Sequence, residues 1–249
     1  MARLKRKTKG LQAKRKAKPK RRSLVWRLLR RPAKFALGLL IFVVLWVWSY
    51  SVINPPGGLY MGWEAWRLGG VSQDWRDLEQ ISPQLARAAM AGEDARFCDH
   101  NGFDFEAIEA ALRANEQGRR IRGGSTITQQ VAKNVFLWHE RSWARKGLEA
   151  GFTVLIEVLW TKRRVLEVYL NIVELAPGVF GAEAGARHHF GRPAAALSLT
   201  QAARLAAILP APKSRSASKP SAYTKRRGRS IAAGAETLRR EARDRCVFD

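Results

Sequence analysis

One long apolar segment stands out in the hydropathy pattern, near the N-terminus of the chain. Residues 35–53, FALGLLIFVVLWVWSYSVI, carry no charged side chain, and Ser49 and Ser51 are the main polar interruptions. As a helix these 19 residues would extend over roughly 28 Å at about 1.5 Å per residue, close to the thickness of the hydrocarbon core of a bilayer. The pattern therefore predicts a transmembrane helix.

Two other interpretations of residues 35–53 are weaker. A buried core helix does not explain Trp46, Trp48 and Tyr50, which lie at one end of the segment, where an interfacial aromatic belt is expected. A cleaved signal peptide usually has an apolar run of about 7 to 15 residues, and no small-x-small cleavage site precedes Asn54. We expect a retained signal anchor.

A Pro-Gly linker follows the span and leads into a segment rich in tryptophan. Trp63, Trp66 and Trp75 suit two roles equally well. They could pack into the following domain, or they could lie at the headgroup boundary of a membrane.

Helical periodicity continues almost without interruption from residue 82, and no segment alternates long enough to predict a strand. The fold class is therefore all-α. Ser82, Ser125 and Thr161 are the expected N-caps, and Ser198 with Gln201 forms an expected capping box. The predicted helices cover residues 82–95, 105–117, 126–137, 142–160, 162–173 and 198–210.

Charge divides the chain unevenly, although the formal net charge is +24. Residues 1–34 hold 16 Lys or Arg and no acid, and residues 213–249 hold 11 basic against 4 acidic residues. Residues 35–212 are nearly neutral, with 18 basic and 17 acidic residues. We expect a basic N-terminal tail (1–34), the anchor (35–53), a folded domain (55–212) and a basic, loosely ordered C-terminal tail (213–249). Each tail is either a solvated segment or a site for anionic lipid or nucleic acid.

The two cysteines and the four histidines indicate no metal centre. Cys98 and Cys246 could form a disulfide in an oxidising compartment, or they could remain free thiols. The histidines lack the spacing of a zinc site, and no Gly-rich loop follows a strand, so a nucleotide fold is not expected.

The pair Glu93-Asp94 lies at a predicted junction between a helix and a loop. Acids at the C-terminal end of a helix oppose its dipole, so their position suggests another role. Partial burial and the neighbouring carboxylate would each raise the pKa of Glu93 and suit it to act as a general base.

The start of the helix at 126–137 is a predicted anion site, because its first N–H groups lack partners within the helix. Further on, Arg145, Lys146 and Glu149 share one helical turn, beside an apolar stripe. The cations suit a departing phosphate, and Glu149 could orient them or a divalent ion. Spacing alone equally allows Glu149 a plain i,i+4 salt bridge with Arg145 on a solvated helix. One face of the helix predicted at 126–137 carries Gln130, Lys133 and Asn134.

These residues lie in segments that resemble a known family. EDARFCDHNGFD, GGSTITQQVAKN, RKGLE and KRRVLEVYLN resemble, in order and spacing, four motifs of glycosyltransferase family 51, the peptidoglycan glycosyltransferases. NIVELAPGVFGAEAGARHHFGRPAAALSLTQAARLAAILPAP is similar to the family's last motif region. The resemblance covers about residues 55–212. The single-domain, monofunctional variety is the nearest match, since the sequence leaves no room for a transpeptidase domain.

The resemblance implies a lysozyme-like helical domain that polymerises lipid II into β-1,4-linked glycan, with inversion and release of polyprenyl diphosphate. Glu93 would be the catalytic base and Glu149 the second catalytic acid. It also implies that residues 113–122 form a loop that handles the acceptor, although a plain exposed loop fits equally well. The substrate-binding residues would be Asp94, Ser125, Gln130, Lys133, Asn134, Arg145 and Lys146.

The resemblance further implies partners and a location. The partners would be lipid II, the growing lipid-linked glycan, the membrane and other cell-wall synthesis or division proteins, with no nucleic acid. No cofactor is certain, and a divalent cation, Mg²⁺ or Mn²⁺, remains an alternative. The basic residues ahead of the span predict a cytoplasmic N-terminus and a periplasmic catalytic domain at the bacterial inner membrane.

Two other classes of function are less compatible with the sequence. A lysozyme-like lytic enzyme would share the fold and a catalytic Glu, but it has no use for Lys133, Arg145 and Lys146 beside a second acid. A membrane-anchored nucleic-acid-binding protein is suggested by the tails alone, and the neutral central body carries no nucleic-acid-binding signature.

Overall fold

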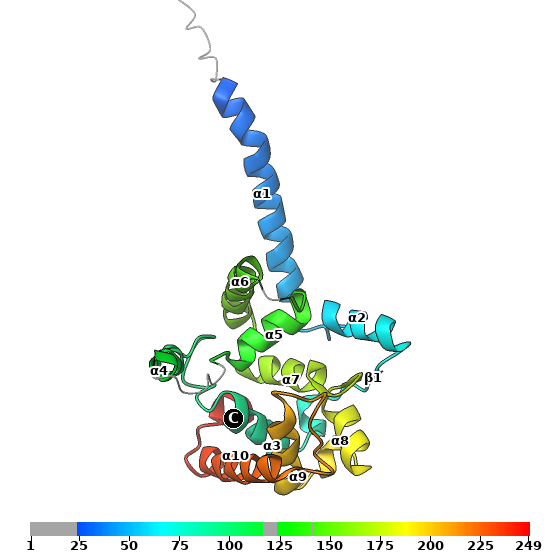
Figure 1. The fold of residues 1–249 in the computed structure, drawn as a ribbon. Helices are drawn as coiled ribbons and strands as arrows, with labels where there is room; N and C mark the ends of the chain where they lie inside the picture. The colour runs from blue at the N-terminus through cyan, green and yellow to red at the C-terminus, as the bar shows by residue number, and fades with distance from the viewer. Residues whose placement is uncertain (1–23, 117–123, 141) are drawn as a thin grey trace, which may run out of the picture. The chain divides into compact units, whose positions relative to one another are not determined.

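Helices dominate the architecture (Figure 1). The computed structural model describes residues 24–116, 124–140 and 142–249. The described chain divides into two units, of which one ends at Val43 and the other comprises Val44–Asp249. The all-α prediction is confirmed. Most of the predicted N-terminal tail, and most of the predicted acceptor loop at 113–122, lie outside the described residues.

Helix α1 (Leu24–Ser49) contains the predicted span. Its segment Arg30–Ser49 is long and apolar enough to cross a membrane. The side chains of Phe35, Leu40 and Ile41 are 75, 56 and 51% exposed. A core helix of a soluble domain would bury such residues, so their exposure argues against that interpretation. The helix ends at Ser49, and the last four residues of the predicted span form a turn instead.

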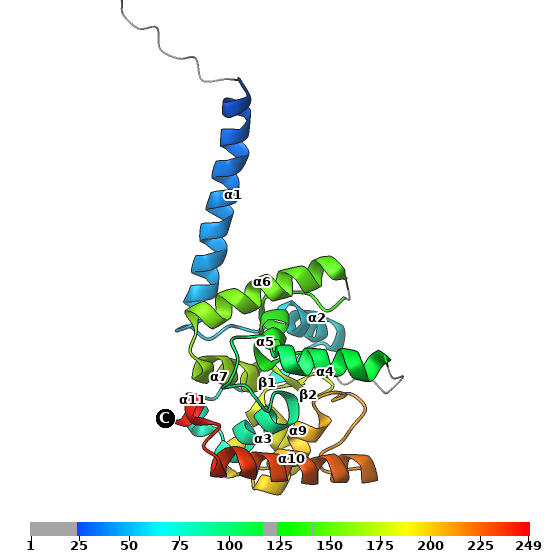
Figure 2. The ribbon, with the colours of Figure 1, turned by 90° about the vertical axis from the view of Figure 1, so that its left-hand side faces the viewer.

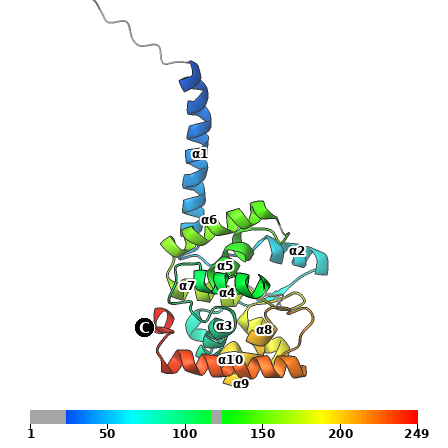
Figure 3. The same ribbon diagram turned by 60° about the vertical axis from the view of Figure 1, so that its left-hand side comes forward.

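Two groups of helices form the domain. In one, α3 (Pro83–Glu93), α9 (Leu199–Ile208) and α10 (Ala222–Arg240) pack against one another. In the other, α5 (Ile127–Phe136) packs against α6 (Trp143–Leu159) and α7 (Lys162–Ile172). Figures 2 and 3 show α6 along one edge of the domain and α10 along the opposite edge. The shorter helices are α2 (Leu59–Leu68), α4 (Phe105–Glu116), α8 (Ala182–Phe190) and α11 (Arg245–Phe248), with the 3₁₀ turns η1 (Leu78–Gln80) and η2 (Ala194–Ala196).

The sheet is minor, as the absence of alternating segments predicted. Strand β3 (Val179–Phe180) lies between β1 (Ser72–Gln73), which is parallel to it, and β2 (Glu174–Ala176), which is antiparallel. Each strand has two or three residues, too few for a period of two to show in the sequence.

The helix boundaries follow the predicted caps, with two differences. Thr161 and the Ser198–Gln201 capping box act as predicted. Ser82 precedes α3, but its hydroxyl donates to the carbonyl of Leu197 and does not cap the helix. The predicted cap at Ser125 is wrong. Thr126 caps α5 instead, because Gln129, three residues later, completes a capping box with it.

The three tryptophans after the linker differ in their exposure. The guanidinium of Arg164 lies 5.6 Å from the ring centroid of Trp75, which is half-buried. Trp63 and Trp66 are exposed, and their ring centroids are 5.0 Å apart. Only Trp75 therefore packs into the domain.

The expectation of a loosely ordered tail at residues 213–249 is wrong. Within α10, Thr224, Gly228, Ile231, Ala235 and Leu238 are buried. Their spacing of three and four residues places them on one helical face, which packs against α3 and α9. The many basic residues of this segment hid that apolar stripe, because the stripe consists mainly of small side chains.

A disulfide between Cys98 and Cys246 resolves the alternatives left open by the sequence. It joins the loop after α3 to α11, across 148 residues of sequence. The same loop and the C-terminal segment meet again where the Arg243 guanidinium lies 3.2 Å from both the Ala95 carbonyl and the Asp99 carboxylate. The C-terminal segment is therefore fastened beside the first motif.

Reduction of this disulfide should lower the free energy of unfolding by about 2–5 kcal/mol, because the unfolded chain loses a long covalent loop. Thermal unfolding of the detergent-solubilised protein, with and without a dithiol reductant, measures the effect. The double variant Cys98→Ser/Cys246→Ser is the control, and its melting temperature should not respond to the reductant. Equal melting temperatures of the oxidised and reduced wild type would contradict this stabilising role.

Candidate active site

Glu93 is the last residue of α3, and its carboxylate is held from two sides. The Gln130 amide donates to Oε2 at 3.1 Å, and the Arg227 guanidinium lies 3.5 Å from Oε1. The Glu93 side chain is 14% exposed. A carboxylate from α3 thus meets an amide from α5 and a cation from α10.

Burial raises the pKa of Glu93, and the neighbouring charge of Asp94 acts in the same direction. The hydrogen bond from Gln130 and the charges of Arg227 and Lys133 lower that pKa and offset part of the effect. A raised pKa brings a carboxylate closer to the value that suits a general base near neutral pH.

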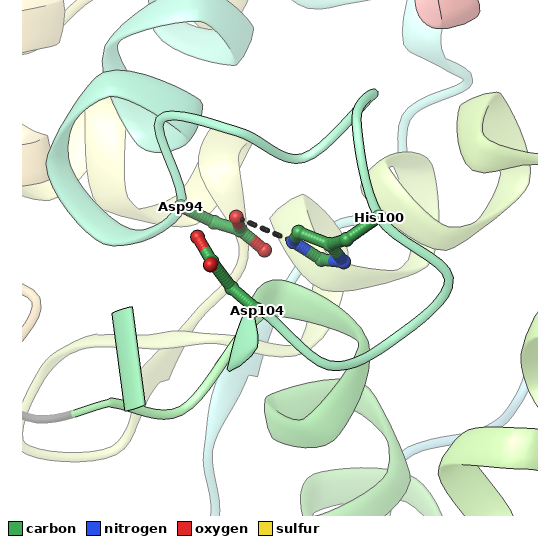
Figure 4. A group of neighbouring side chains, drawn as sticks. All are labelled: Asp94, His100 and Asp104. Atoms are coloured by element: carbon green, nitrogen blue, oxygen red, sulfur yellow. Dashed lines mark hydrogen bonds and ion pairs between the residues drawn. The ribbon is translucent and has the colours of Figure 1, made fainter. Parts of the chain in front are cut away.

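Asp94 follows Glu93 and binds protein groups with both carboxylate oxygens. Oδ1 lies 2.9 Å from Nε2 of His100, as Figure 4 shows, and Oδ2 accepts the N–H of Ile127 at 3.0 Å. Ile127 is the first residue of α5, so the anion at the start of this helix is Asp94 itself. The predicted anion site is therefore occupied from within the chain. Asp94 does not line either of the two cavities described below, and its contact with substrate stays a prediction.

The structure offers poor ligands for the divalent cation considered from the sequence. Asp94, His100 and Asp104 bring one ligand atom each to within 4.8 Å of one another (Figure 4). However, Asp94 is engaged at both oxygens, and Asp104 Oδ1 accepts the N–H of Ala107 in the first turn of α4. These three groups serve as caps and loop contacts, and we assign no step to a metal.

A cavity of about 280 Å³ lies beside Gln130. Three of its side chains are cationic and one is a carboxylate, so its lining carries net positive charge. A phosphate group suits such a site. The lining residues are Ser125, Gln129, Gln130, Lys133, His139, Arg145, Lys146 and Glu149.

Glu149 is 3% exposed, so the solvated salt bridge that its spacing allowed is not what forms. Its Oε2 accepts a hydrogen bond from Arg145 Nη1 at 2.6 Å, and its Oε1 contacts the ammonium of Lys146. Arg145 also donates to the carbonyl of Glu140 at 2.7 Å. With both oxygens facing cations, Glu149 orients Arg145 and Lys146 and is a poor metal ligand.

His139 is a neutral member of this cationic cavity. Burial lowers its pKa to about 4, and the charges of Lys133, Arg145 and Lys213 act in the same direction. Its ring stacks on Tyr60 with a centroid distance of 3.7 Å. At neutral pH His139 therefore contributes hydrogen-bonding capacity without charge.

A second cavity, of about 540 Å³, shares Gln130, Lys133 and His139 with the first, so the two are contiguous. It includes the predicted residue Asn134. Further lining comes from Tyr60 of α2, Glu174 of β2 and the segment at 209–214.

Hydrogen bonds and ion pairs join the polar side chains in the wall of this second cavity. Tyr60 donates to Glu174 at 2.7 Å, and Lys213 lies 2.9 Å from Glu64 of α2. Burial raises the pKa of Tyr60 to about 12, so its hydroxyl stays protonated at neutral pH.

Comparison with known proteins identifies the family. Residues 64–235 match the family described as Transglycosylase. The chain belongs to this transglycosylase family. The match extends past residue 212 into α10, in agreement with the packing of that helix.

Several relatives are about 50% identical in sequence to this chain and align with most of its length. Three are called biosynthetic peptidoglycan transglycosylase. The protein of Jannaschia sp. (strain CCS1) is 53% identical over 212 residues, which are 85% of this chain and 86% of the relative. That of Rhodospirillum centenum is 48% identical over 231 residues, or 91% and 99% of the two chains. That of Pseudomonas aeruginosa PAO1 is 51% identical over 206 residues, or 80% and 89%. The enzyme class expected from the motifs is confirmed, as is the lysozyme-like helical fold of this family.

The structure of the transglycosylase brings most of the predicted residues together. Ser125, Gln130, Lys133, Arg145, Lys146 and Glu149 line the first cavity, and Glu93 reaches it through Gln130. Five residues that line the two cavities or contact Glu93 were not predicted from the sequence. Glu174 had a signal, its i+3 spacing from Asn171. His139 lies between the second and third motifs, Tyr60 lies before the first, and Lys213 and Arg227 lie in the supposed tail. The missed residues are Tyr60, His139, Glu174, Lys213 and Arg227.

Replacing Arg145 should destabilise the transglycosylase more than replacing Lys146. Arg145→Ala leaves a buried carboxylate short of one partner and should lower the free energy of unfolding by about 1–3 kcal/mol. Lys146→Ala, the matched control on the same turn, removes a side chain that is 43% exposed and should cost less than about 1 kcal/mol. Thermal or urea unfolding measures both. Equal losses would mean that Glu149 does not depend on Arg145.

Proposed function

We propose that this transglycosylase is a peptidoglycan glycosyltransferase that polymerises lipid II into β-1,4-linked glycan. The observation that supports this function most directly is that the largely buried carboxylate of Glu93 lies next to a cationic cavity. Gln130 donates to this carboxylate and also lines the cavity. The names of the relatives point to the same polymer. The donor is the growing glycan on polyprenyl diphosphate, and the acceptor is lipid II.

Glu93 acts as the base in this proposal. It takes the proton of the 4-hydroxyl of the acceptor GlcNAc while that oxygen forms a bond to the anomeric carbon of the donor MurNAc. The bond from this carbon to the diphosphate oxygen breaks, and the electron pair leaves with polyprenyl diphosphate. Attack from the face opposite the leaving group inverts the configuration.

The cationic cavity stabilises the leaving group. Lys133, Arg145 and Lys146 face the charge that develops on the diphosphate, and Glu149 keeps the last two in place. A glycosidase needs a protonated carboxylic acid for its poor leaving group. A diphosphate is already a good leaving group, so cations suffice and Glu149 need not supply a proton.

The anchor suits these substrates. The apolar segment of α1 would keep the enzyme in the bilayer that holds both lipid-linked sugars, which raises their effective concentration. The basic residues ahead of the span would retain the N-terminus in the cytoplasm and place the catalytic domain in the periplasm.

The decisive assay uses the purified full-length protein in detergent with labelled lipid II. The expected product is a polymer that lysozyme digests. Hydrolysed monomer as the only product would contradict the proposal and would favour the lytic alternative.

Glu93→Gln should reduce polymer formation at least about 100-fold, because the amide keeps the size of the side chain but cannot accept the proton. The rate of lipid II polymerisation measures the loss. Glu106→Gln is the matched control, since its carboxylate is 76% exposed on α4 and should have little effect. Near-normal turnover of Glu93→Gln would remove Glu93 from the role of base.

The rate should also fall on the acidic side at a higher pH than an ordinary glutamate would give. Burial raises the pKa of Glu93, and the base works only when ionised, so activity is lost as the pH falls through that raised value. A profile of kcat/KM against pH should show this limb above about 4.3, the usual glutamate pKa. A limb at or below the ordinary value would show that burial does not control the base.

A further inference from the structure

Arg227 is the residue of α10 that reaches Glu93. Its Nη2 lies 3.5 Å from Glu93 Oε1 and donates to the carbonyl of Gly92 at 3.1 Å. Within the described part of the chain its Nε is buried without a hydrogen-bond partner. The guanidinium is thus drawn into the junction after α3, at a cost in unmet hydrogen bonding that a purely surface contact would not require.

Close packing between α3 and α10 brings Arg227 to this position. A Cβ on Gly92 would lie 3.2 Å from Ile231 Cδ1, and a Cβ on Gly234 would lie 3.1 Å from Ala91 Cβ. Both distances are tighter than ordinary van der Waals contact. Because glycine has no Cβ at these positions, the two helices can approach closely. The third side of the contact is α9, which packs on both helices.

We propose that Arg227 is a positioning residue for glycosyl transfer, which orients the Glu93 carboxylate through Oε1 and electrostatically stabilises its ionised form. This inference rests on the proposed role of Glu93 as the base. Gln130 donates to Oε2 from α5, and the Arg227 guanidinium lies 3.5 Å from Oε1, so partners on two different helices hold the carboxylate at both oxygens. An oriented carboxylate presents its remaining lone pairs to the acceptor hydroxyl without a search among rotamers.

The charged and titratable groups around Glu93 come from four elements. Asp94 at the end of α3 favours the protonated form, as does burial, whereas Lys133 of α5 and Arg227 favour the carboxylate. Tyr169 of α7 is fully buried, and its pKa is raised, so it stays neutral. Arg227 is the cation that makes direct contact with Oε1, and its removal leaves burial and Asp94 opposed mainly by Lys133 and the Gln130 hydrogen bond.

The charge of Arg227 determines in which direction its removal shifts the pH profile. Loss of the positive charge raises the pKa of Glu93, so the base becomes protonated at a higher pH. The acidic limb of kcat/KM for lipid II polymerisation should then move to higher pH, by about one unit for one charge in direct contact with a carboxylate. On the acidic side the variant should lose up to about tenfold relative to the wild type, and the loss should shrink toward alkaline pH.

The experiment compares full-length variants in detergent with labelled lipid II over a range of pH. Arg227→Gln and Arg227→Met should both show the shifted limb, while Arg227→Lys, which keeps the charge, should restore most of the wild-type profile. Arg229→Gln is the matched control, because it removes the same charge from an exposed position of α10 and should leave the profile in place. Melting temperatures establish that each variant is folded.

Three outcomes overturn the inference. These are an unmoved limb in folded Arg227→Gln and Arg227→Met, a similar shift in Arg229→Gln, or failure of both neutral variants to fold, which would make Arg227 a structural support. Glu93→Gln separates this inference from the proposed function. Normal activity of that variant refutes the base itself. If it is inactive while Arg227→Gln retains the wild-type limb, only the role of Arg227 fails.

Discussion

One carboxylate joins the two helix ends that meet at the candidate active site. Asp94 accepts the first N–H of α5 and binds His100, and so it joins the end of α3 to the start of α5. Glu93 precedes this joint, and Gln130 and Lys133 follow one turn into the second helix. If the two helix ends moved apart, Glu93 would lose both its amide donor and its place beside the cavity. The favourable interaction of an anion with a helix N-terminus is therefore used here to set catalytic geometry.

The buried charge of Glu149 is also balanced by partners within the chain. A lone carboxylate at the exposure of Glu149 would be expensive, and two cations from its own helix offset that cost. The two carboxylates of the site are therefore adjusted differently. Burial raises the pKa of Glu93, whose Oε1 faces Arg227 and whose Oε2 accepts from Gln130, whereas Glu149 has cations at both oxygens and orients them. The difference agrees with one group moving a proton and the other holding charge in place.

Much of this arrangement could be predicted from the sequence, because the relevant signals are local. Caps such as Thr161 and Ser198, and motif residues such as Lys133 and Arg145, are read within a few positions. Thr126 was missed because Ser125 is an equally good capping residue, and only the pairing with Gln129 distinguishes them. Arg227 could not be found in this way. Its partner lies 134 positions away on α3, and its own helix carries so many basic side chains that the buried face is obscured.

The packing of α10 also bears on how the enzyme matures. Every motif lies before residue 213, yet Lys213 in the cavity wall and Arg227 beside Glu93 come after the last of them. During synthesis these residues leave the ribosome after all the motifs. Glu93 and the cavity thus lack these charged neighbours until α10 packs against α3 and Cys246 reaches Cys98. The surroundings of Glu93 are therefore complete only after the C-terminal segment has folded against α3.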